Sequence, residues 1–533
     1  MCGIWFYLSF HQPCIKQLFE SFQTIEPRGP EISTFQKISN DLFVGFHRLS
    51  IHCLSGLGNQ PFVKSGGVGK TIYSICNGEI YNYDTIRKEY LSEECFQSSS
   101  DCEVIPFLYM KYGNKIINYL EGEFVFIICE VDHNTKEWRI HGGRDPFGVR
   151  PLFYGHDENG IVFGSELKSI YSSSKRVDVF PPGHIFSIDS KNKKIELYKY
   201  YLMKMEQINN NNIYEQIRNK FIECVVKRLS SERPLGCLLS GGLDSSIVSA
   251  ITAKHVKHVL HTFTIGLEGA TDIKYAEMVS KHIKSIHQTF IVTIQDALDA
   301  IEEVIYTIES YDCTTVRASV WQYLLGKKIK ENTDIKVLLT GEGSDELMSG
   351  YMYFHKAPDA YESHRENMRL LEDIHRFDGL RVDRAMSCHG LEVRIPFLDP
   401  EFVEMFLSLP MELRMASRGI EKQLFRDAFK DTDYLPHEVL YRRKEAFSDG
   451  TSSLEKSWFE ILQEHIGGLV SDEEFMNHKY GVEVDSKEKY YYKKIFEKNF
   501  GEKCFGVIPY YWLPKWCGNV MEPSARVLDV YSK

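Results

Sequence analysis

LGCLLSGGLDSSI, residues 235–247, joins an apolar run to a glycine-rich loop and then to a stretch that favours a helix. The apolar run predicts a buried strand, and Gly241 and Gly242 let the backbone come close to a phosphate group. Hydroxyl groups of the loop, and the amides that begin the helix, would donate to anionic oxygens. Asp244 is placed to hold Mg²⁺ beside those oxygens. The stretch therefore predicts a phosphate-binding loop in an α/β domain.

The sequence on both sides of this loop alternates between strand and helix patterns, which predicts a doubly wound parallel sheet. Glu342 and Asp345 directly follow one of the expected strands, so their carboxylates should lie at the sheet edge where ligands bind. The expected strands cover residues 235–239, 260–265, 288–293 and 336–340, and the expected helices cover 213–229, 245–255 and 272–284.

The first 200 residues show a different pattern. Short apolar or alternating segments are separated by Gly, Asn or Asp turns, which predicts a strand-rich domain. The change falls near Asn209–Asn212, a run of four asparagines that cannot form a core. We therefore expect one domain over residues 2–202, a linker over 203–212 and a second domain over 213–533.

Composition and charge argue against several classes of function. The chain has 533 residues, 43% of them hydrophobic, and a net charge of −11, which disfavours nucleic acid as a partner. No apolar run approaches the roughly 18 residues of a membrane helix, and the N-terminus lacks the basic start of a signal peptide. The 13 cysteines include no CxxC pair, which indicates reduced thiols. We expect a cytoplasmic protein without nucleic-acid or membrane partners; a homodimer is left open.

Cys2 is the first of a second group of residues whose side chains suit catalysis or ligand binding. Once Met1 is removed, the free α-amine of Cys2 can serve as general base to its own thiol. Arg48 ends an expected strand and suits a carboxylate clamp, while NGEIYN (residues 77–82) offers an Asn amide and a Gly N–H for an oxyanion. Asp101 can hold an ammonium group. Together these groups describe a pocket for glutamine.

This group resembles the class II glutamine amidotransferase domain, and the similarity extends to about Tyr201 through GRDPFGVRPLFY (residues 143–154) and GSELK (residues 164–168). One departure is PRGPE at residues 27–31, where that family usually has His-Arg-Gly-Pro-Asp. The resemblance implies an α+β N-terminal nucleophile (Ntn) hydrolase fold, an αββα sandwich. It implies Cys2, Asn77 and Gly78 as catalytic. It implies glutamine binding by Arg48, Leu49, Ser50, Ile51, His52, Asn77, Gly78, Glu79 and Asp101.

The loop at 240–246 resembles the PP-loop of ATP pyrophosphatases, which split ATP between the α and β phosphates. TGEGSDELMSGYMYFHKAP (residues 340–358), YDCTTVRAS (311–319), GLEVRIPFLD (390–399) and RRKEAFSDG (442–450) resemble the synthetase domain of glutamine-hydrolysing asparagine synthetases. YYWLPKW (510–516) and PSAR (523–526) are similar to the tail of the animal type. The two resemblances cover nearly the whole chain.

This second resemblance implies ATP as co-substrate with Mg²⁺, and aspartate as the acceptor of nitrogen from glutamine. It implies Asp244 and Asp345 as metal ligands and Glu342 as a catalytic residue. Thr314, Arg317 and Lys444 are expected near aspartate or pyrophosphate. The implied ATP-binding residues are Leu238, Ser240, Gly241, Gly242, Leu243, Asp244, Ser245, Ser246, Ile265, Thr340 and Gly341.

Other interpretations remain open from the sequence alone. A related synthetase could act on another acid, as β-lactam synthetases do, although those usually lack the Cys2 nucleophile. An inactive scaffold copy would be marked by loss of Cys2, Asp244 or Asp345, and none is lost. GGVGKT (residues 66–71) is expected to form a hairpin turn rather than a nucleotide loop. The Tyr/Lys-rich segment at 486–498 is expected to present a solvated helix face rather than a nucleic-acid site.

Overall fold

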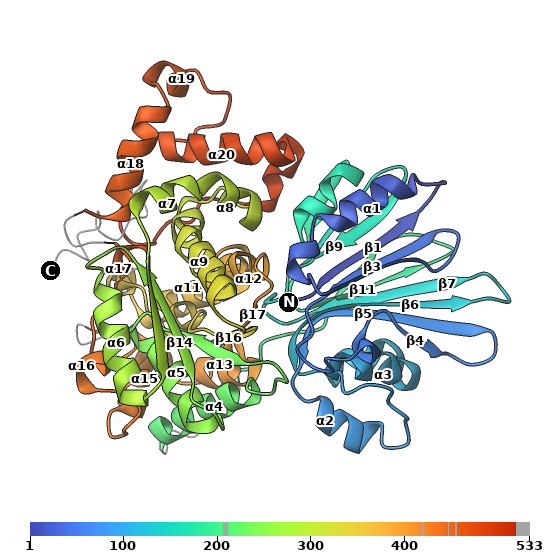
Figure 1. The fold of residues 1–533 in the computed structure, drawn as a ribbon, viewed down its shortest axis with the longest axis horizontal. Helices are drawn as coiled ribbons and strands as arrows, with labels where there is room; N and C mark the ends of the chain where they lie inside the picture. Colours follow the sequence, from blue (N-terminus) through green and yellow to red (C-terminus); the bar gives the residue numbers. More distant parts are fainter. Residues whose placement is uncertain (206–211, 417–419, 446, 453–455, 519–533) are drawn as a thin grey trace. The chain divides into compact units, whose positions relative to one another are not determined.

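The computed structural model describes residues 1–205, 212–416, 420–445, 447–452 and 456–518. The chain divides into two compact units. Unit 1 contains Met1–Leu202 together with two short segments from later in the chain, Ser230–Pro234 and Ser387–Glu392. Unit 2 contains the rest (Figure 1). The expected linker at 203–212 lies in part outside the described residues, and the PSAR motif (523–526) lies entirely outside them.

Unit 1 is built on two six-stranded antiparallel sheets. The order of the first is β10-β8-β9-β1-β3-β2 and that of the second is β12-β11-β7-β6-β5-β4. The first sheet comprises β1 (Gly3–Ser9), β2 (Ile32–Lys37), β3 (Leu42–Arg48), β8 (Phe153–His156), β9 (Gly160–Gly164) and β10 (Arg176–Val179). The second comprises β4 (Phe62–Ser65), β5 (Lys70–Ile80), β6 (Gly122–Asp132), β7 (Trp138–Arg144), β11 (His184–Asp189) and β12 (Glu196–Lys199).

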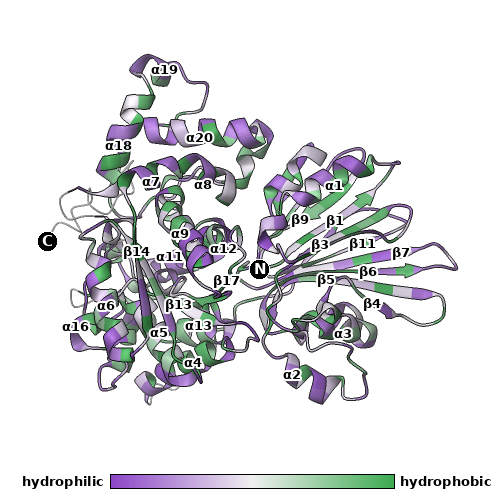
Figure 2. Cartoon of the chain, in the orientation of Figure 1, coloured by the Kyte–Doolittle hydropathy of each residue, from purple (hydrophilic) through white to green (hydrophobic). Residues whose placement is uncertain are grey.

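Apolar side chains hold these two sheets face to face. Phe6 of β1, Val44 of β3 and Ile127 of β6 belong to one buried cluster with residues from both sheets. Helix α3 (Val104–Tyr112) covers the outer face of the second sheet, and α1 (Ile15–Gln23) packs Phe22 against the first. The predicted αββα sandwich is therefore confirmed. Hydrophilic residues lie at the hairpin end of β6 and β7 (Figure 2).

Unit 2 contains a five-stranded sheet in the order β15-β14-β13-β16-β17. The pairs β14/β15, β13/β14 and β13/β16 are all parallel, which confirms the predicted doubly wound arrangement. The strands are β13 (Leu235–Leu238), β14 (His261–Gly266), β15 (Ile286–Ile291), β16 (Val337–Leu339) and β17 (Glu392–Arg394). The helices beside them include α4 (Ile213–Lys227), α5 (Leu243–His255), α6 (Thr271–Ile283) and α9 (Cys313–Asn332).

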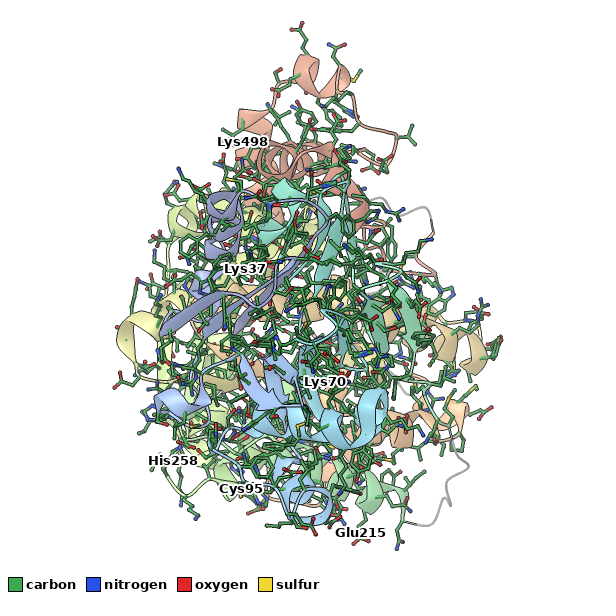
Figure 3. The ribbon with its side chains drawn as sticks, turned by 90° about the vertical axis from the view of Figure 1, so that its right-hand side faces the viewer. Lys37, Lys70, Cys95, Glu215, His258 and Lys498 are labelled. Atoms are coloured by element: carbon green, nitrogen blue, oxygen red, sulfur yellow. The ribbon has the colours of Figure 1, made fainter. Side chains whose placement is uncertain are left out.

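Two further predictions can be compared with the structure. Residues 66–70 form the turn between β4 and β5, because Gly66 N donates to Lys70 O at 3.0 Å, so the hairpin interpretation of GGVGKT is confirmed. Helix α20 (Lys487–Phe500) has the expected solvated face, with Lys498 exposed (Figure 3). The opposite face buries Tyr492, Phe496 and Phe500, which recur every fourth residue. Among the described residues, no helix is both long and apolar enough to span a bilayer.

Candidate active sites

Cys2 directly precedes β1, and its Sγ donates to the carbonyl oxygen of Leu49 at 3.6 Å. The side chain packs against the cluster between the two sheets of unit 1. On β5, Ile75 belongs to that cluster, whereas Cys76 and Ile80 face α3. Because side chains alternate along a strand, Asn77 points to the same inner face as Ile75. The side chains of Cys2 and Asn77 therefore both face the space between the two sheets.

Asn77 is fully buried, and neither its amide nitrogen nor its amide oxygen has a hydrogen-bond partner among the described residues. A buried amide without a partner is costly, so its presence points to a ligand. Gly78 has φ +143°, and a Cβ there would lie 2.0 Å from the carbonyl oxygen of Glu123. Only glycine fits this position, because the backbone of β6 lies so close to it. The buried amide of Asn77, which has no hydrogen-bond partner among the described residues, suits the stabilisation of an oxyanion.

The expected carboxylate clamp, Arg48, is buried at the end of β3 and fastens the loop that follows it. One terminal nitrogen donates to Ser55 O at 2.8 Å and to Asn59 Oδ1 at 2.6 Å. The other donates to His52 O at 3.4 Å and to Cys53 O. The guanidinium group thus shapes the loop that contains four of the expected glutamine-binding residues, Leu49, Ser50, Ile51 and His52.

The expected acidic groups also lie around this loop. His52 Nε2 is 3.1 Å from Glu79 Oε2, with both side chains buried. Asp101 Oδ2 accepts a hydrogen bond from Ile80 N at 2.7 Å, which ties the acid to the end of β5. The buried Asp101 carboxylate is therefore held next to the strand that contains Asn77 and Gly78, where it suits the binding of an amine.

The electrostatics of Cys2 explain why its thiol needs a base. Burial raises the pKa of the thiol to about 11, although the nearby N-terminal amine acts in the opposite direction. Burial also lowers the pKa of that amine to about 6. A thiol with a raised pKa stays protonated at pH 7 and therefore needs a base. The amine with the lowered pKa belongs to Met1, whose side chain is buried, so this value does not describe the α-amine of Cys2 that would act as base once Met1 is removed.

Sequence reasoning missed two residues, one that contacts Cys2 and one that contacts the loop after β3. Buried Arg28 donates from Nε to Cys2 O at 3.0 Å and pairs with Glu166 at 2.6 Å. Glu31 accepts from Ser50 N at 2.9 Å and pairs with Arg233 at 2.6 Å. Both belong to PRGPE, the run that departs from the family pattern. That quoted run was the signal that could have identified them.

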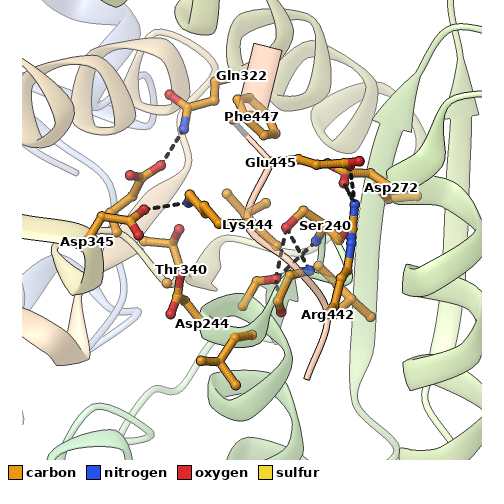
Figure 4. Close-up of a pocket in the computed structure, with 18 of the residues that line it drawn as sticks. Ser240, Asp244, Asp272, Gln322, Thr340, Asp345, Arg442, Lys444, Glu445 and Phe447 are labelled. Carbon is orange, nitrogen blue, oxygen red and sulfur yellow. Dashed lines mark hydrogen bonds and ion pairs between the residues drawn. The ribbon is translucent and has the colours of Figure 1, made fainter. Parts of the chain in front are cut away.

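The second site is a pocket of unit 2 at the carboxyl ends of β13, β14 and β16 (Figure 4). It holds about 1010 Å³ of space, its open mouth included. Most of the expected nucleotide residues line it, namely Leu238, Ser240, Gly242, Leu243, Asp244, Ser245, Ile265, Thr340 and Gly341. Gly241 and Ser246 do not; Gly241 has φ +72°, and a Cβ there would meet the backbone of Tyr275 and Ala276.

Opposite charges converge in this pocket. Lys422 Nζ lies 2.6 Å from Asp244 Oδ2 and 2.6 Å from Asp345 Oδ1, and Lys444 Nζ lies 2.5 Å from Asp345 Oδ2. Burial alone would raise the pKa of Asp345, but the two ammonium groups outweigh it and hold that pKa well below its usual range. Asp345 therefore stays charged, and the carboxylates of Asp244 and Asp345 meet at the ammonium group of Lys422.

This arrangement fits a magnesium ion that arrives with a nucleotide. Among the described residues no group of three His, Cys, Asp or Glu side chains forms a complete metal site. Two carboxylates that meet at one ammonium group are nevertheless the protein contribution that Mg²⁺ commonly needs, because phosphate and water oxygens complete its shell. Asp244 and Asp345 would be those ligands, and Lys422 would have to move aside.

Glu342 faces the same pocket from the loop after β16. Its carboxylate accepts from Gln322 Nε2 at 2.8 Å and from Arg381 at 2.9 Å. Burial raises its pKa, and Arg381 opposes that effect. A half-buried carboxylate with a raised pKa, fixed by two donors beside a phosphate loop, is suited to exchange a proton.

Thr314 and Arg317 do not line this pocket, although Gln322 of the same helix does. Thr314 Oγ1 donates to Asp312 Oδ2 at 2.5 Å. Arg317 makes a buried two-point contact with Glu488 of α20, at 2.8 and 2.5 Å. The expected roles of Thr314 and Arg317 at aspartate or pyrophosphate remain predictions, whereas Lys444 does lie in the pocket.

Several pocket residues were absent from the expected set. They include Lys422, Arg381 and Gln322, together with an ion pair between Arg442 and Asp272 at 2.7 Å. Burial raises the pKa of Asp272 to about 6 in spite of Arg442. Arg442 belongs to the quoted RRKEAFSDG run, so a signal existed for it. Lys422 lies in no quoted motif.

Comparisons with known proteins identify the family of both parts of the chain. Residues 1–220 match the family model described as a glutamine amidotransferase domain, and residues 216–371 and 359–507 match the one described as asparagine synthase. The glutamine-hydrolysing asparagine synthetase of Cricetulus griseus is 39% identical over 570 residues, which cover 100% of this chain and 99% of that protein. The Homo sapiens enzyme is also 39% identical, over 575 residues with the same coverage. The chain therefore belongs to the family of glutamine-hydrolysing asparagine synthetases.

Proposed function

We propose that this protein makes asparagine from aspartate, with ATP as the energy source and glutamine as the nitrogen donor. The observation that carries the proposal is the pairing of two sites in a chain similar to such enzymes along its full length. One site has a partly buried thiol and a buried amide that has no hydrogen-bond partner in the described part of the chain, and the other has two carboxylates that converge beside a phosphate loop. Neither a β-lactam synthetase activity nor a scaffold role is favoured.

In the first half-reaction, the sulfur of Cys2 attacks the side-chain amide carbon of glutamine. The α-amine, free once Met1 is removed, takes the thiol proton and returns it to the leaving nitrogen, so ammonia departs and a thioester remains. The negative oxygen of the tetrahedral intermediate would receive hydrogen bonds from Asn77 and Gly78. Water then cleaves the thioester to glutamate and restores the thiol.

In the second half-reaction, a β-carboxylate oxygen of aspartate attacks the α-phosphorus of ATP and pyrophosphate leaves. Ser240, Gly242 and Ser245 would bind phosphate oxygens, and bound Mg²⁺ would neutralise phosphate charge at Asp244 and Asp345. Ammonia then attacks the carbonyl carbon of β-aspartyl-AMP, AMP leaves with the bonding electrons, and Glu342 is placed to accept the proton released from nitrogen.

We also propose a cytoplasmic enzyme that acts on small molecules. All 13 cysteines are free thiols, which supports a reducing compartment. The net charge of −11 supports the absence of a nucleic-acid partner. Light scattering of the purified protein would decide whether it is a homodimer.

A product assay tests the proposed function. Purified protein is incubated with glutamine, aspartate and MgATP, and asparagine, glutamate, AMP and pyrophosphate are measured. We expect one AMP and one pyrophosphate for each asparagine. ADP and phosphate as the stoichiometric products would contradict the adenylate mechanism, and the amidation of another acid in preference to aspartate would contradict the substrate.

A further inference from the structure

Unit 1 includes a short segment, Ser230–Pro234, that follows α4 in sequence and directly precedes β13. We propose that Glu232 and Arg233 of this segment are positioning residues for glutamine, because they fix the conformation of the loop that binds it. This inference rests on the proposed use of glutamine at Cys2. It means that the glutamine site is not completed by the first 202 residues alone.

We call residues 49–55, which follow β3, the glutamine loop. Glu232 holds the second half of this loop. Its carboxylate oxygen Oε1 accepts from Cys53 N at 2.9 Å and from Ser99 Oγ at 3.1 Å, and its own N–H donates to Ile51 O at 3.1 Å. The Cys53 hydrogen bond is the largest influence on the carboxyl group of Glu232 and lowers its pKa. Glu232 therefore remains an anion at neutral pH and keeps its capacity to accept these hydrogen bonds.

The loop needs such support because Cys53 has a left-handed backbone with φ +58°. A residue with a side chain adopts this conformation at an energetic cost, so neighbouring contacts must maintain it. Glu232 accepts a hydrogen bond from the N–H of Cys53, and Arg48 donates one to the carbonyl oxygen of Cys53. Both backbone groups of Cys53 are therefore held, the carbonyl by Arg48 at the end of β3 and the N–H by Glu232 of the later segment.

Arg233 holds the first half of the same loop. Its Nε donates to Ser50 O at 2.9 Å, and its Nη2 donates to Glu31 Oε1 at 2.6 Å. Glu31 in turn accepts from Ser50 N at 2.9 Å. Both peptide groups of Ser50 are therefore fixed by the Arg233–Glu31 pair.

The fixed loop lies between the groups expected to contact glutamine. Arg48 precedes it, and His52 within it is 3.1 Å from Glu79. Ser99, which binds Glu232, is two residues from Asp101. Glu232 and Arg233 hold residues 50–53, whereas Cys2 contacts Leu49 O, which comes before the part of the loop that they hold. A drift of residues 50–53 would therefore misplace glutamine-binding groups but would leave Cys2 and the phosphate loop in place. We therefore expect Glu232 and Arg233 to govern glutamine binding rather than the chemistry of either site.

The test compares Glu232→Ala, Glu232→Gln and Arg233→Ala in the full chain. Glu215→Gln is the matched control, because Glu215 is exposed on the first turn of α4 (Figure 3). Asparagine formation is measured with glutamine and, separately, with ammonium chloride. We expect the KM for glutamine to rise about three- to tenfold in the two alanine variants, with a smaller rise in Glu232→Gln. The ammonium-driven rate should match that of the control.

Alkylation of Cys2 provides a second readout. A glutamine-shaped diazoketone should label Cys2 more slowly in the alanine variants, whereas iodoacetamide should label it at the parental rate. An unchanged KM and unchanged diazoketone labelling would overturn the inference, and so would a parallel fall in ammonium-driven synthesis or in iodoacetamide labelling. If the parental protein itself shows neither diazoketone labelling at Cys2 nor glutamine-driven synthesis, the proposed function fails instead.

Discussion

The two sites differ in how their polar groups are arranged before any ligand binds. In the Cys2 site, Arg48 and Asp101 are hydrogen-bonded to the backbone, and the buried amide of Asn77 has no partner among the residues that the structure describes. In the nucleotide pocket, charged side chains neutralise one another, with Lys422 between Asp244 and Asp345. The first site is therefore ready for a neutral amide, whereas the second must exchange ion pairs when a charged nucleotide and its metal enter.

The largest effect on asparagine synthesis is expected from a change in the nucleotide pocket. Asp244→Ala removes one of the two carboxylates that converge on Lys422, so phosphate charge would be less well neutralised. We expect synthesis to be abolished with either nitrogen donor, while glutamine hydrolysis stays measurable. Asparagine and glutamate are quantified side by side. Asparagine formation at the parental rate would refute the assignment of the phosphate loop.

A large effect confined to the other site is expected from Asn77→Ala. This change removes the amide that we assign to the oxyanion. Loss of one oxyanion donor lowers kcat by a factor of about 10²–10³. Glutamine hydrolysis should fall by that factor, and ammonium-driven synthesis should not change. A kcat that is unaffected, with only KM altered, would show that Asn77 binds substrate without stabilising the oxyanion.

Lys422→Met tests the ion-pair exchange in the nucleotide pocket. Without the ammonium group, Asp244 loses its ion pair and Asp345 keeps only Lys444. The loss of one partner of a buried ion pair costs about 3 kcal/mol, and we expect a smaller cost for these half-buried carboxylates. We expect a lower Tm in the metal-free variant and a larger rise of Tm with Mg²⁺ than in the parent. Lys281→Met, an exposed change on α6, is the control. Equal Mg²⁺ effects in all three proteins would contradict this role of Lys422.

A smaller effect concerns the acid stability of unit 1. Burial lowers the pKa of His47 on β3 to about 4, so the folded state disfavours its protonation. Between pH 6.5 and pH 4 the unfolded chain binds more protons at this group, and stability falls as pH falls. At pH 5 the loss is about 1–2 kcal/mol. Replacing His47 with Gln should reduce the Tm difference between pH 7 and pH 5; an undiminished difference would assign the acid sensitivity to other groups.

The parts of these sites that the sequence predicts are those next to a strand end. Asp244, Glu342 and Asp345 follow β13 or β16 within a few residues, and the ends of parallel strands meet at one edge, so their meeting could be inferred. Asn77 could likewise be assigned to the glutamine site from a short motif on β5. The local pattern is informative here because the chain geometry alone brings these residues together.

The partners of these residues could not be predicted, because ion pairs join distant positions without a local signal. Lys422 lies 178 residues from Asp244, and Glu232 lies 179 residues from Cys53. Arg317 was expected at a ligand, yet the structure pairs it with Glu488, 171 residues away. In each case the sequence shows that charged residues of both signs are present, but tertiary packing decides which of them pair with one another.

The most direct test of the central claim, that two separate sites act in sequence, uses isotopic competition. The parent and the Cys2→Ala variant receive aspartate, MgATP, glutamine labelled with ¹⁵N in its amide, and unlabelled ammonium chloride. We predict that the parent incorporates ¹⁵N into asparagine, and that Cys2→Ala forms only unlabelled asparagine at a rate close to the ammonium-driven rate of the parent. Labelled asparagine from Cys2→Ala, or loss of both activities in a folded variant, would contradict the account.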